Sequence, residues 1–203
     1  MQNTNSTAPK LPSHAEITTT DIFYLFERHG AADYDGEPVS QASHMIQCAM
    51  LAMENMSDLP VIIGALLHDI GHLLKHEQKT KAMGGFGVVD HEGVGAWYLK
   101  HKGFSERVCA IVKHHVAAKR YLVATDNNYQ KRLSPASLQT LVWQGGPMTP
   151  DETSAFEKQP YFTDIINVRH WDEEAKNTNA EVLPITYFQK ILWDHLSDKN
   201  RLK

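Results

Sequence analysis

Several features that mark other classes of protein are missing from this chain. No apolar run approaches the roughly 20 residues that a membrane-spanning helix needs, and the opening stretch MQNTNSTAPKLPSHAE lacks the apolar core of a signal peptide. The chain has only two cysteines, Cys48 and Cys109, so it has neither a disulfide framework nor a CxxC ligand pair. These absences favour a reducing compartment, and we expect a cytoplasmic protein.

An excess of basic charge is missing as well. The formal net charge is -4, the pI is about 6.3, and no long basic run occurs. Nucleic acid and membrane surfaces are therefore not expected as partners, and a small-molecule substrate is. The length of 203 residues suits one domain, acting as a monomer or a small homo-oligomer.

Alternating apolar and polar residues, the signature of half-buried strands, are also absent over any useful length. The apolar spacing instead predicts an all-α, single-domain fold over residues 17–203, preceded by a disordered arm over 1–16. Acidic and glycine-containing residues 29–40 and glycine-rich residues 81–90 are expected as loops. Helices are predicted at 21–28, 40–55, 60–75, 90–103, 105–124, 134–144, 150 onward, 161–176 and 184 onward.

Histidine is abundant, with 12 residues, and two of the most informative positions are His68 and Asp69. They end the apolar segment VIIGALLHDI, where burying an unpaired imidazole or carboxylate is costly. Neighbouring helical residues point about 100° apart, so both side chains can reach one site beside the helix. A carboxylate has two oxygens and can bridge two metal ions.

Three further histidines lie on separate predicted helices. His44 is in the apolar segment that follows Ser40, His91 is in a first helical turn, and His115 lies on the stripe that contains Val108. His114 is rotated off that stripe, so we expect it at the surface. One histidine per helix around a His-Asp pair predicts a metal site, and nitrogen and carboxylate ligands without thiolate suit iron, manganese or zinc.

These residues resemble the HD superfamily, and in particular its mixed-valence di-iron oxygenases. That branch includes myo-inositol oxygenase and the 2-amino-1-hydroxyethylphosphonate dioxygenases, and the phosphonate enzymes are the better match. The resemblance covers the chain from about residue 24 to residue 176. The segments that carry it are DYDGEPVSQASH, HDIGHL, WQGGPM and RHWDEEAK. Simpler HD phosphohydrolases keep one metal and lack the two middle histidines.

The resemblance implies two iron ions, in a mixed Fe(II)/Fe(III) state, with dioxygen as co-substrate. The family's last acidic ligand matches Asp172 in RHWDEEAK, whereas Asp164 is expected to be a solvated helix residue. By resemblance the two ligand sets are His44, His68, Asp69 and Asp172 for one iron, and Asp69, His91 and His115 for the other.

Four polar residues offer a set that suits a phosphonate or phosphate group. His72 follows His68 by four residues, Lys119 follows His115 by four, and Ser137 and Thr140 are three apart on one predicted helix. In the enzymes that the chain resembles, residues at these positions hold the phosphonate.

Tyr34 and Glu37 match family residues that control access to the iron and meet the substrate amine, so we expect both in catalysis and Glu37 in substrate binding. Asp33 and Asp35 add negative charge beside Tyr34 and have no place in the family pattern. They are either a solvated acidic loop or part of a site for a larger cation such as a quaternary ammonium. We favour slightly the methylated amine.

The resemblance therefore implies oxidative carbon–phosphorus bond cleavage in phosphonate catabolism. The expected substrate is a 1-hydroxy-2-(amino or trimethylammonio)ethylphosphonate, and the products are glycine or glycine betaine plus phosphate. The alternative is a metal-dependent HD phosphohydrolase that acts on a small phosphate ester or nucleotide, because hydrolysis needs only metal-bound hydroxide. A binding module without catalytic metal is the third hypothesis, and six intact ligand positions argue against it.

Overall fold

The computed structural model of the chain describes residues 11–34, 37–78 and 90–198. Helices dominate these ranges, and the only extended pairing within them is an isolated bridge between Asp33 and Ser40. The predicted all-α class is confirmed. The helices are α1 (His14–His29), α2 (Gln41–Glu54), α3 (Leu59–Leu67), α4 (Ile70–Gln78), α5 (His91–His101), α6 (Glu106–Thr125), α7 (Tyr129–Arg132), α8 (Pro135–Trp143), α9 (Pro150–Phe156), α10 (Phe162–Glu174), η1 (Ile185–Phe188) and α11 (Gln189–Ser197).

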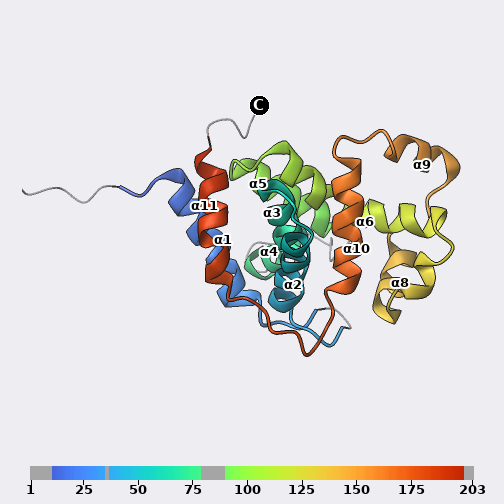
Figure 1. Cartoon of the computed structure of the whole chain (residues 1–203), viewed down its shortest axis with the longest axis horizontal. Helices are drawn as coiled ribbons and strands as arrows, with labels where there is room; N and C mark the ends of the chain where they lie inside the picture. Colours follow the sequence, from blue (N-terminus) through green and yellow to red (C-terminus); the bar gives the residue numbers. More distant parts are fainter. Residues whose placement is uncertain (1–10, 35–36, 79–89, 199–203) are drawn as a thin grey trace, which may run out of the picture.

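The apolar helix α3 lies at the centre of the molecule. Every residue of α3 from Val61 to Leu67 is buried, and α3 packs against α2, α6, α10 and α11. Figure 1 shows α1 and α11 on one side of this centre and α6 with α10 on the other. A helix that is apolar on all sides must be covered on all sides, and the fold therefore builds its core, and its site, around the end of α3.

The first helix begins at His14, inside the stretch that we expected to be a disordered arm. Ser13 accepts a hydrogen bond from the backbone N–H of Glu16, and the Glu16 carboxylate accepts one from the Ser13 backbone N–H. This capping box is visible in the sequence as Ser-x-x-Glu, and it moves the boundary of the folded domain to residue 13. Of the predicted arm, residues 1–10 lie outside the described ranges.

The segment from Pro60 to Lys75, predicted as one helix, forms two. The helix breaks at His68 and Asp69, which form a turn between α3 and α4. The backbone N–H of His72 donates a hydrogen bond to the carbonyl oxygen of Asp69, three residues earlier, at 2.9 Å. This short-range hydrogen bond keeps the turn tight. Both side chains are buried at this break, and the backbone of His68 keeps helical φ and ψ angles.

The remaining predicted helices form with small shifts at their ends, and α7 was not predicted. A capping box formed by Thr149 and Glu152 starts α9. The predicted glycine-rich loop lies outside the described residues except for Asp90, which caps α5. Within the described ranges, no helix combines the length and the apolar character needed to cross a membrane.

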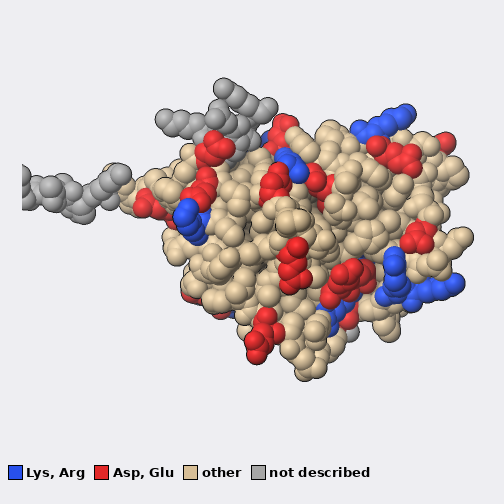
Figure 2. All heavy atoms as spheres, in the orientation of Figure 1, with Lys and Arg blue, Asp and Glu red and all other residues tan. Residues whose placement is uncertain are grey.

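Charged side chains are dispersed over the surface. On the face drawn in Figure 2, lysine and arginine side chains alternate with aspartate and glutamate, and no extended basic area is seen there.

Gly71, directly after the turn, lets α4 approach α5 closely. A methyl group at Gly71 would lie 2.0 Å from the His91 carbonyl oxygen, which is backbone and has no rotamer to change. We expect Gly71→Ala to displace α5 and lower the free energy of unfolding by about 1–3 kcal/mol, measured by urea unfolding of metal-free protein.

Gly95→Ala, in the facing helix α5, is the control. Its added methyl group would have its nearest neighbours at 3.2 Å, in the side chains of Ile70 and Val112, so it requires a much smaller shift. Equal unfolding midpoints for the two variants would contradict the assigned role of Gly71.

Candidate metal centre

Six side chains from five separate parts of the fold converge beside the end of α3. All of them are buried, although each carries an imidazole or a carboxylate. They are the six residues expected to be ligands: His44 of α2, His68 and Asp69 of the turn, His91 of α5, His115 of α6, and Asp172 of α10.

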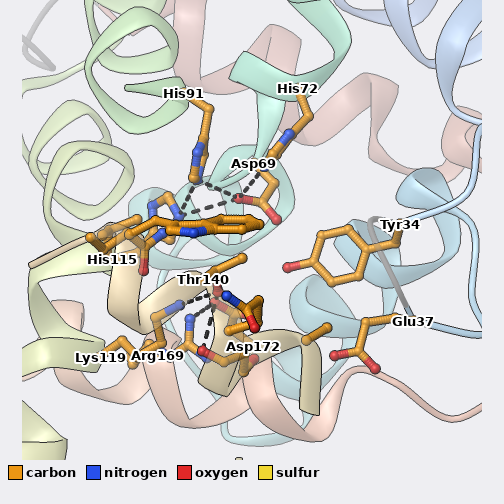
Figure 3. Close-up of a pocket in the computed structure, with 16 residues that line it drawn as sticks. Tyr34, Glu37, Asp69, His72, His91, His115, Lys119, Thr140, Arg169 and Asp172 are labelled. Carbon is orange, nitrogen blue, oxygen red and sulfur yellow. Dashed lines mark hydrogen bonds and ion pairs between the residues drawn. The ribbon is translucent and has the colours of Figure 1, made fainter. Parts of the chain in front are cut away.

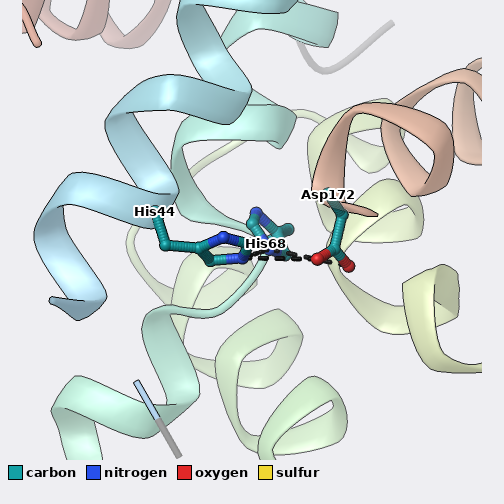
Figure 4. A group of neighbouring side chains, drawn as sticks. All are labelled: His44, His68 and Asp172. Atoms are coloured by element: carbon teal, nitrogen blue, oxygen red, sulfur yellow. Dashed lines mark hydrogen bonds and ion pairs between the residues drawn. The ribbon is translucent and has the colours of Figure 1, made fainter. Parts of the chain in front are cut away.

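His44, His68 and Asp172 form the first group of this centre (Figure 4). The Nε2 atoms of His44 and His68 are 3.1 Å apart. Asp172 Oδ1 lies 3.3 Å from His44 Nε2, and Asp172 Oδ2 lies 3.8 Å from His68 Nε2. One nitrogen from each ring and the carboxylate thus point at a common position.

His91 and His115 form the second group. Their Nε2 atoms are 3.0 Å apart, and they lie 3.4 and 3.2 Å, respectively, from Asp69 Oδ1. His72 stacks on His91 with ring centroids 4.1 Å apart, and its Nε2 atom is 3.9 Å from the same Asp69 oxygen (Figure 3). His72, expected at the substrate, therefore borders this second group.

The Asp69 carboxylate lies between the two groups. Its Oδ1 atom faces His91 and His115, whereas its Oδ2 atom lies 3.6 Å from His44 Nε2 and 3.4 Å from His68 Nε2. One oxygen is directed at each pair of imidazoles, which is the arrangement that a bridging carboxylate requires.

Backbone carbonyls fix which nitrogen of three rings is available. The Nδ1 atoms of His44, His68 and His115 lie 2.9, 2.8 and 2.7 Å from the carbonyl oxygens of Ala175, Ala65 and Val112. A carbonyl only accepts, so each Nδ1 donates and, in the neutral ring, Nε2 keeps its lone pair. Metal-ligating histidines are oriented in this way by their other nitrogen.

The Nε2 lone pairs of these rings point into the centre, where a cation would bind them. Two Nε2 acceptors about 3 Å apart repel each other unless positive charge lies beside them. Asp69 Oδ2 and Asp172 Oδ1 are buried and have no hydrogen-bond partner in the described part of the chain. Buried polar groups are rarely left in this state, so the donor set fits a metal ion bound by nitrogen and oxygen.

The electrostatics of the protein alone point the same way. Burial would lower the pKa of His68, but the Asp69 carboxylate raises it well above the usual value. Burial would raise the pKa of Asp172, yet the Arg169 guanidinium holds it well below its usual range. The pKa of Asp69 is held low mainly by the charge of His68, against the effect of burial. The carboxylates are thus kept ionised, the form that binds metal.

The sequence analysis chose His115 over His114 and Asp172 over Asp164 as ligands, and the structure shows where each of these side chains lies. His115 points into the centre, while His114 is half-buried and packs edge-on against Phe156, with ring centroids 6.2 Å apart. Asp172 faces His44, while Asp164 pairs with Arg107 Nε at 2.7 Å, away from the centre.

A cavity of about 670 Å³ opens beside the two groups. Lys119 lines this cavity and is only 4% exposed. Its ammonium group donates a hydrogen bond to Thr140 Oγ1 at 2.9 Å. Burial, with the nearby charge of Arg169, lowers the pKa of Lys119 to about 7. A buried ammonium with few acceptors gains most when an anionic group enters the cavity.

Tyr34 closes part of the cavity on the other side from Lys119 (Figure 3). Its ring stacks on His44 with centroids 4.0 Å apart and an interplanar angle of 17°. Burial and the charge of Asp69 raise the pKa of Tyr34 well above 10. The phenol is therefore neutral and lies against a member of the first group.

Glu37 and Ser137 also line the cavity, and at least one side-chain oxygen of each already has a partner. Glu37 Oε1 accepts from Lys176 Nζ at 3.0 Å, and Ser137 Oγ donates to Glu173 Oε1 at 3.0 Å. Asp33 lies at the start of the loop and pairs through its backbone with Ser40, whereas Asp35 lies outside the described residues.

Sequence reasoning missed Arg169, which lines the cavity and is 4% exposed. Its side chain donates to Asp172 and, at 2.7 Å, to the Tyr129 hydroxyl. The signal was present, since residues three apart share a helical face and Arg169 precedes Asp172 by three. Trp143 also lines the cavity and is 68% exposed.

Comparison with known proteins identifies relatives of this chain. The HD domain model matches residues 42–142. The chain is 43% identical over 173 residues to [1-hydroxy-2-(trimethylamino)ethyl]phosphonate dioxygenase (glycine-betaine-forming) of Leisingera caerulea, covering 83% of this chain and 85% of that protein. It is 38% identical over 163 residues to hydroxymethylphosphonate dioxygenase of Gimesia maris, covering 80% of each.

A third relative, uncharacterized protein L432 of Acanthamoeba polyphaga mimivirus, is 38% identical over 177 residues, 87% of this chain and 81% of that protein. Identities of this size over most of both chains, together with an HD domain and a buried His/Asp centre, establish common membership. The chain belongs to the HD-domain family that includes the two phosphonate dioxygenases.

Proposed function

We propose that this enzyme uses dioxygen to cleave the carbon–phosphorus bond of a small 1-hydroxyalkylphosphonate. The observation that carries the proposal is the Asp69 carboxylate, which directs one oxygen to each of two imidazole pairs beside a cavity with a buried lysine. The relatives named as phosphonate dioxygenases support the same reaction class.

The reaction balances with dioxygen as the only oxidant. The C1–H and C1–P bonds break, C1 is oxidised to a carboxylate, and dioxygen is reduced as one oxygen atom enters the carboxylate and the other enters phosphate. With an amino or trimethylammonio group on C2, the organic product is glycine or glycine betaine.

In this proposal the metals are two iron ions. His44, His68, Asp69 and Asp172 would hold one, and Asp69, His91 and His115 the other. When bound, the iron pair supplies the redox chemistry that activates dioxygen and removes the C1 hydrogen. The chain's own contribution is to keep the carboxylates ionised, to fix the imidazole tautomers and to orient the substrate.

The cationic side of the cavity would bind the phosphonate. Lys119 and Thr140 are already hydrogen-bonded to each other, and Arg169 adds a second buried cation to the lining. His72 and Ser137 complete the polar wall. Charge-assisted hydrogen bonds of this kind fix the orientation of an anion as well as its affinity.

Tyr34 and Glu37 would act at the other end of the substrate. Tyr34 covers His44, so substrate entry requires the ring to move, and its return would exclude water from the reacting atoms. Glu37 would face the substituent on C2.

The direct test is oxygen uptake by iron-loaded protein supplied with 1-hydroxy-2-(trimethylammonio)ethylphosphonate or hydroxymethylphosphonate. We expect one phosphate released for each dioxygen consumed, and no phosphate under argon. Release of phosphate from phosphate esters without oxygen would favour the phosphohydrolase instead.

We expect Asp69→Ala to remove both metal ions, because this carboxylate faces both imidazole pairs. His91→Ala should empty one position and leave the other at least partly filled. Metal content per chain, measured by elemental analysis after anaerobic iron loading, distinguishes the two variants. Full activity with one metal per chain in the unmodified protein would contradict the dinuclear proposal.

We expect Lys119→Ala to raise KM for the phosphonate about 10- to 100-fold, the cost of one charge-assisted hydrogen bond. Metal content should stay normal, because Lys119 contacts Thr140 and none of the six proposed ligands in the described structure. Exposed Lys113→Ala, on the same helix, is the matched control. Unchanged kinetics in the Lys119 variant would show that the phosphonate binds elsewhere.

A further inference from the structure

A buried ionic cluster lies behind the cavity wall on the side of Glu37. Lys176 Nζ is its centre and lies 3.0 Å from Glu37 Oε1, 3.0 Å from Ser137 Oγ and 3.1 Å from Glu173 Oε2. The Ser134 hydroxyl also donates to Glu37 Oε1. The cluster joins the loop after α1, the start of α8 and the end of α10.

The charges in this cluster are buried and compensated. The side chains of Glu37, Glu173 and Lys176 are only 8%, 9% and 11% exposed. Glu173 has a second cationic partner in Arg169. Buried charges are tolerated when they are paired in this way, so Glu37 is not an uncommitted negative charge.

Glu37 and Lys176 differ in their access to substrate. Glu37 and Ser137 line the cavity, whereas Lys176 contacts both from outside the lining. A cationic group that enters the cavity and approaches Glu37 therefore meets a carboxylate whose Oε1 atom is already paired with an ammonium. Like charges near one carboxylate repel strongly where water is scarce.

Displacement of Lys176 by the cationic group of the substrate is also unfavourable when that group is a trimethylammonium. Lys176 donates to Glu37, Ser137 and Glu173 at once. A trimethylammonium group has no N–H donors, so if it displaced the lysine it could not replace the three hydrogen bonds that Lys176 donates. The geometry thus weakens the attraction that the sequence suggested for Glu37.

We propose that Lys176 is a positioning residue that sets substrate selectivity: by pairing with Glu37 it reduces the enzyme's preference for phosphonates with a cationic tail over those with an uncharged tail. This inference rests on the proposed function, since it concerns the same cavity. The names of the relatives describe one phosphonate with a trimethylamino group and one without. In this proposal Lys176, which lies outside the cavity lining, sets the enzyme's preference between these two kinds of phosphonate.

The test compares equilibrium binding of two unreactive probes to the iron-loaded protein under argon. The probes are ethylphosphonate and 2-(trimethylammonio)ethylphosphonate, which differ only in the cationic tail. We expect Lys176→Met to shift the ratio of their dissociation constants about tenfold in favour of the cationic probe, since it removes the competing ammonium.

Three further variants separate selectivity from general damage. Lys176→Arg keeps the charge and should keep the original ratio. Combining Lys176→Met with Glu37→Gln removes both charges and should reverse the shift. Lys190→Met removes an exposed lysine, 82% exposed and paired only with Asp194 among the described contacts, and should change nothing. Should Lys176→Met fold poorly, Lys176→Gln supplies the same test with a polar side chain.

An unchanged ratio in Lys176→Met or in Lys176→Gln would overturn the proposal, as would an equal shift in the double variant. Failure of the proposed function has a different signature, namely no oxygen uptake by the unmodified protein with any hydroxyphosphonate. Because the binding ratio is measured without turnover, the two failures cannot be confused.

Discussion

The buried Asp69 carboxylate is the constraint on which the rest of the structure depends. It is ionised, almost fully enclosed, and bordered by four imidazole nitrogens. An interior charge of this kind needs compensation, which in the protein alone comes from His68, whose pKa is raised by Asp69, and which a metal ion would supply in its place. The helices that carry those histidines are therefore arranged around a position for positive charge, and the cavity opens where that position can be reached.

The local structure of the segments around Asp69 positions the side chains of the centre. The apolar α3 buries the backbone that precedes Asp69, and the side chains of His68 and Asp69 are buried at the break after Leu67. Gly71 then allows α5 to pack closely enough for His91 to reach the centre.

Much of this was predictable from sequence, for a physical reason. Histidines on apolar helices and a His-Asp pair are anomalous in a core, so the apolar pattern singled out His44 and His115 with the His68–Asp69 pair, whereas Asp172 was assigned only by family resemblance. Sequence reasoning missed contacts between residues that lie far apart in the chain. Glu37 pairs with Lys176, which lies 139 residues away, and no local sequence pattern predicts such a pairing. The break at Asp69 was missed because the apolar pattern runs through it without a glycine or proline.

The separation of the ligands along the chain has a consequence for folding. His44 hydrogen-bonds to the carbonyl of Ala175, which lies 131 residues further on, so the centre is complete only when α10 docks on α2. Contacts of such high sequence separation form late, because the entropy of closing the loop must be overcome first. A metal ion held by Asp172 would therefore bind a chain that is already largely folded, and its binding energy would slow the detachment of α10.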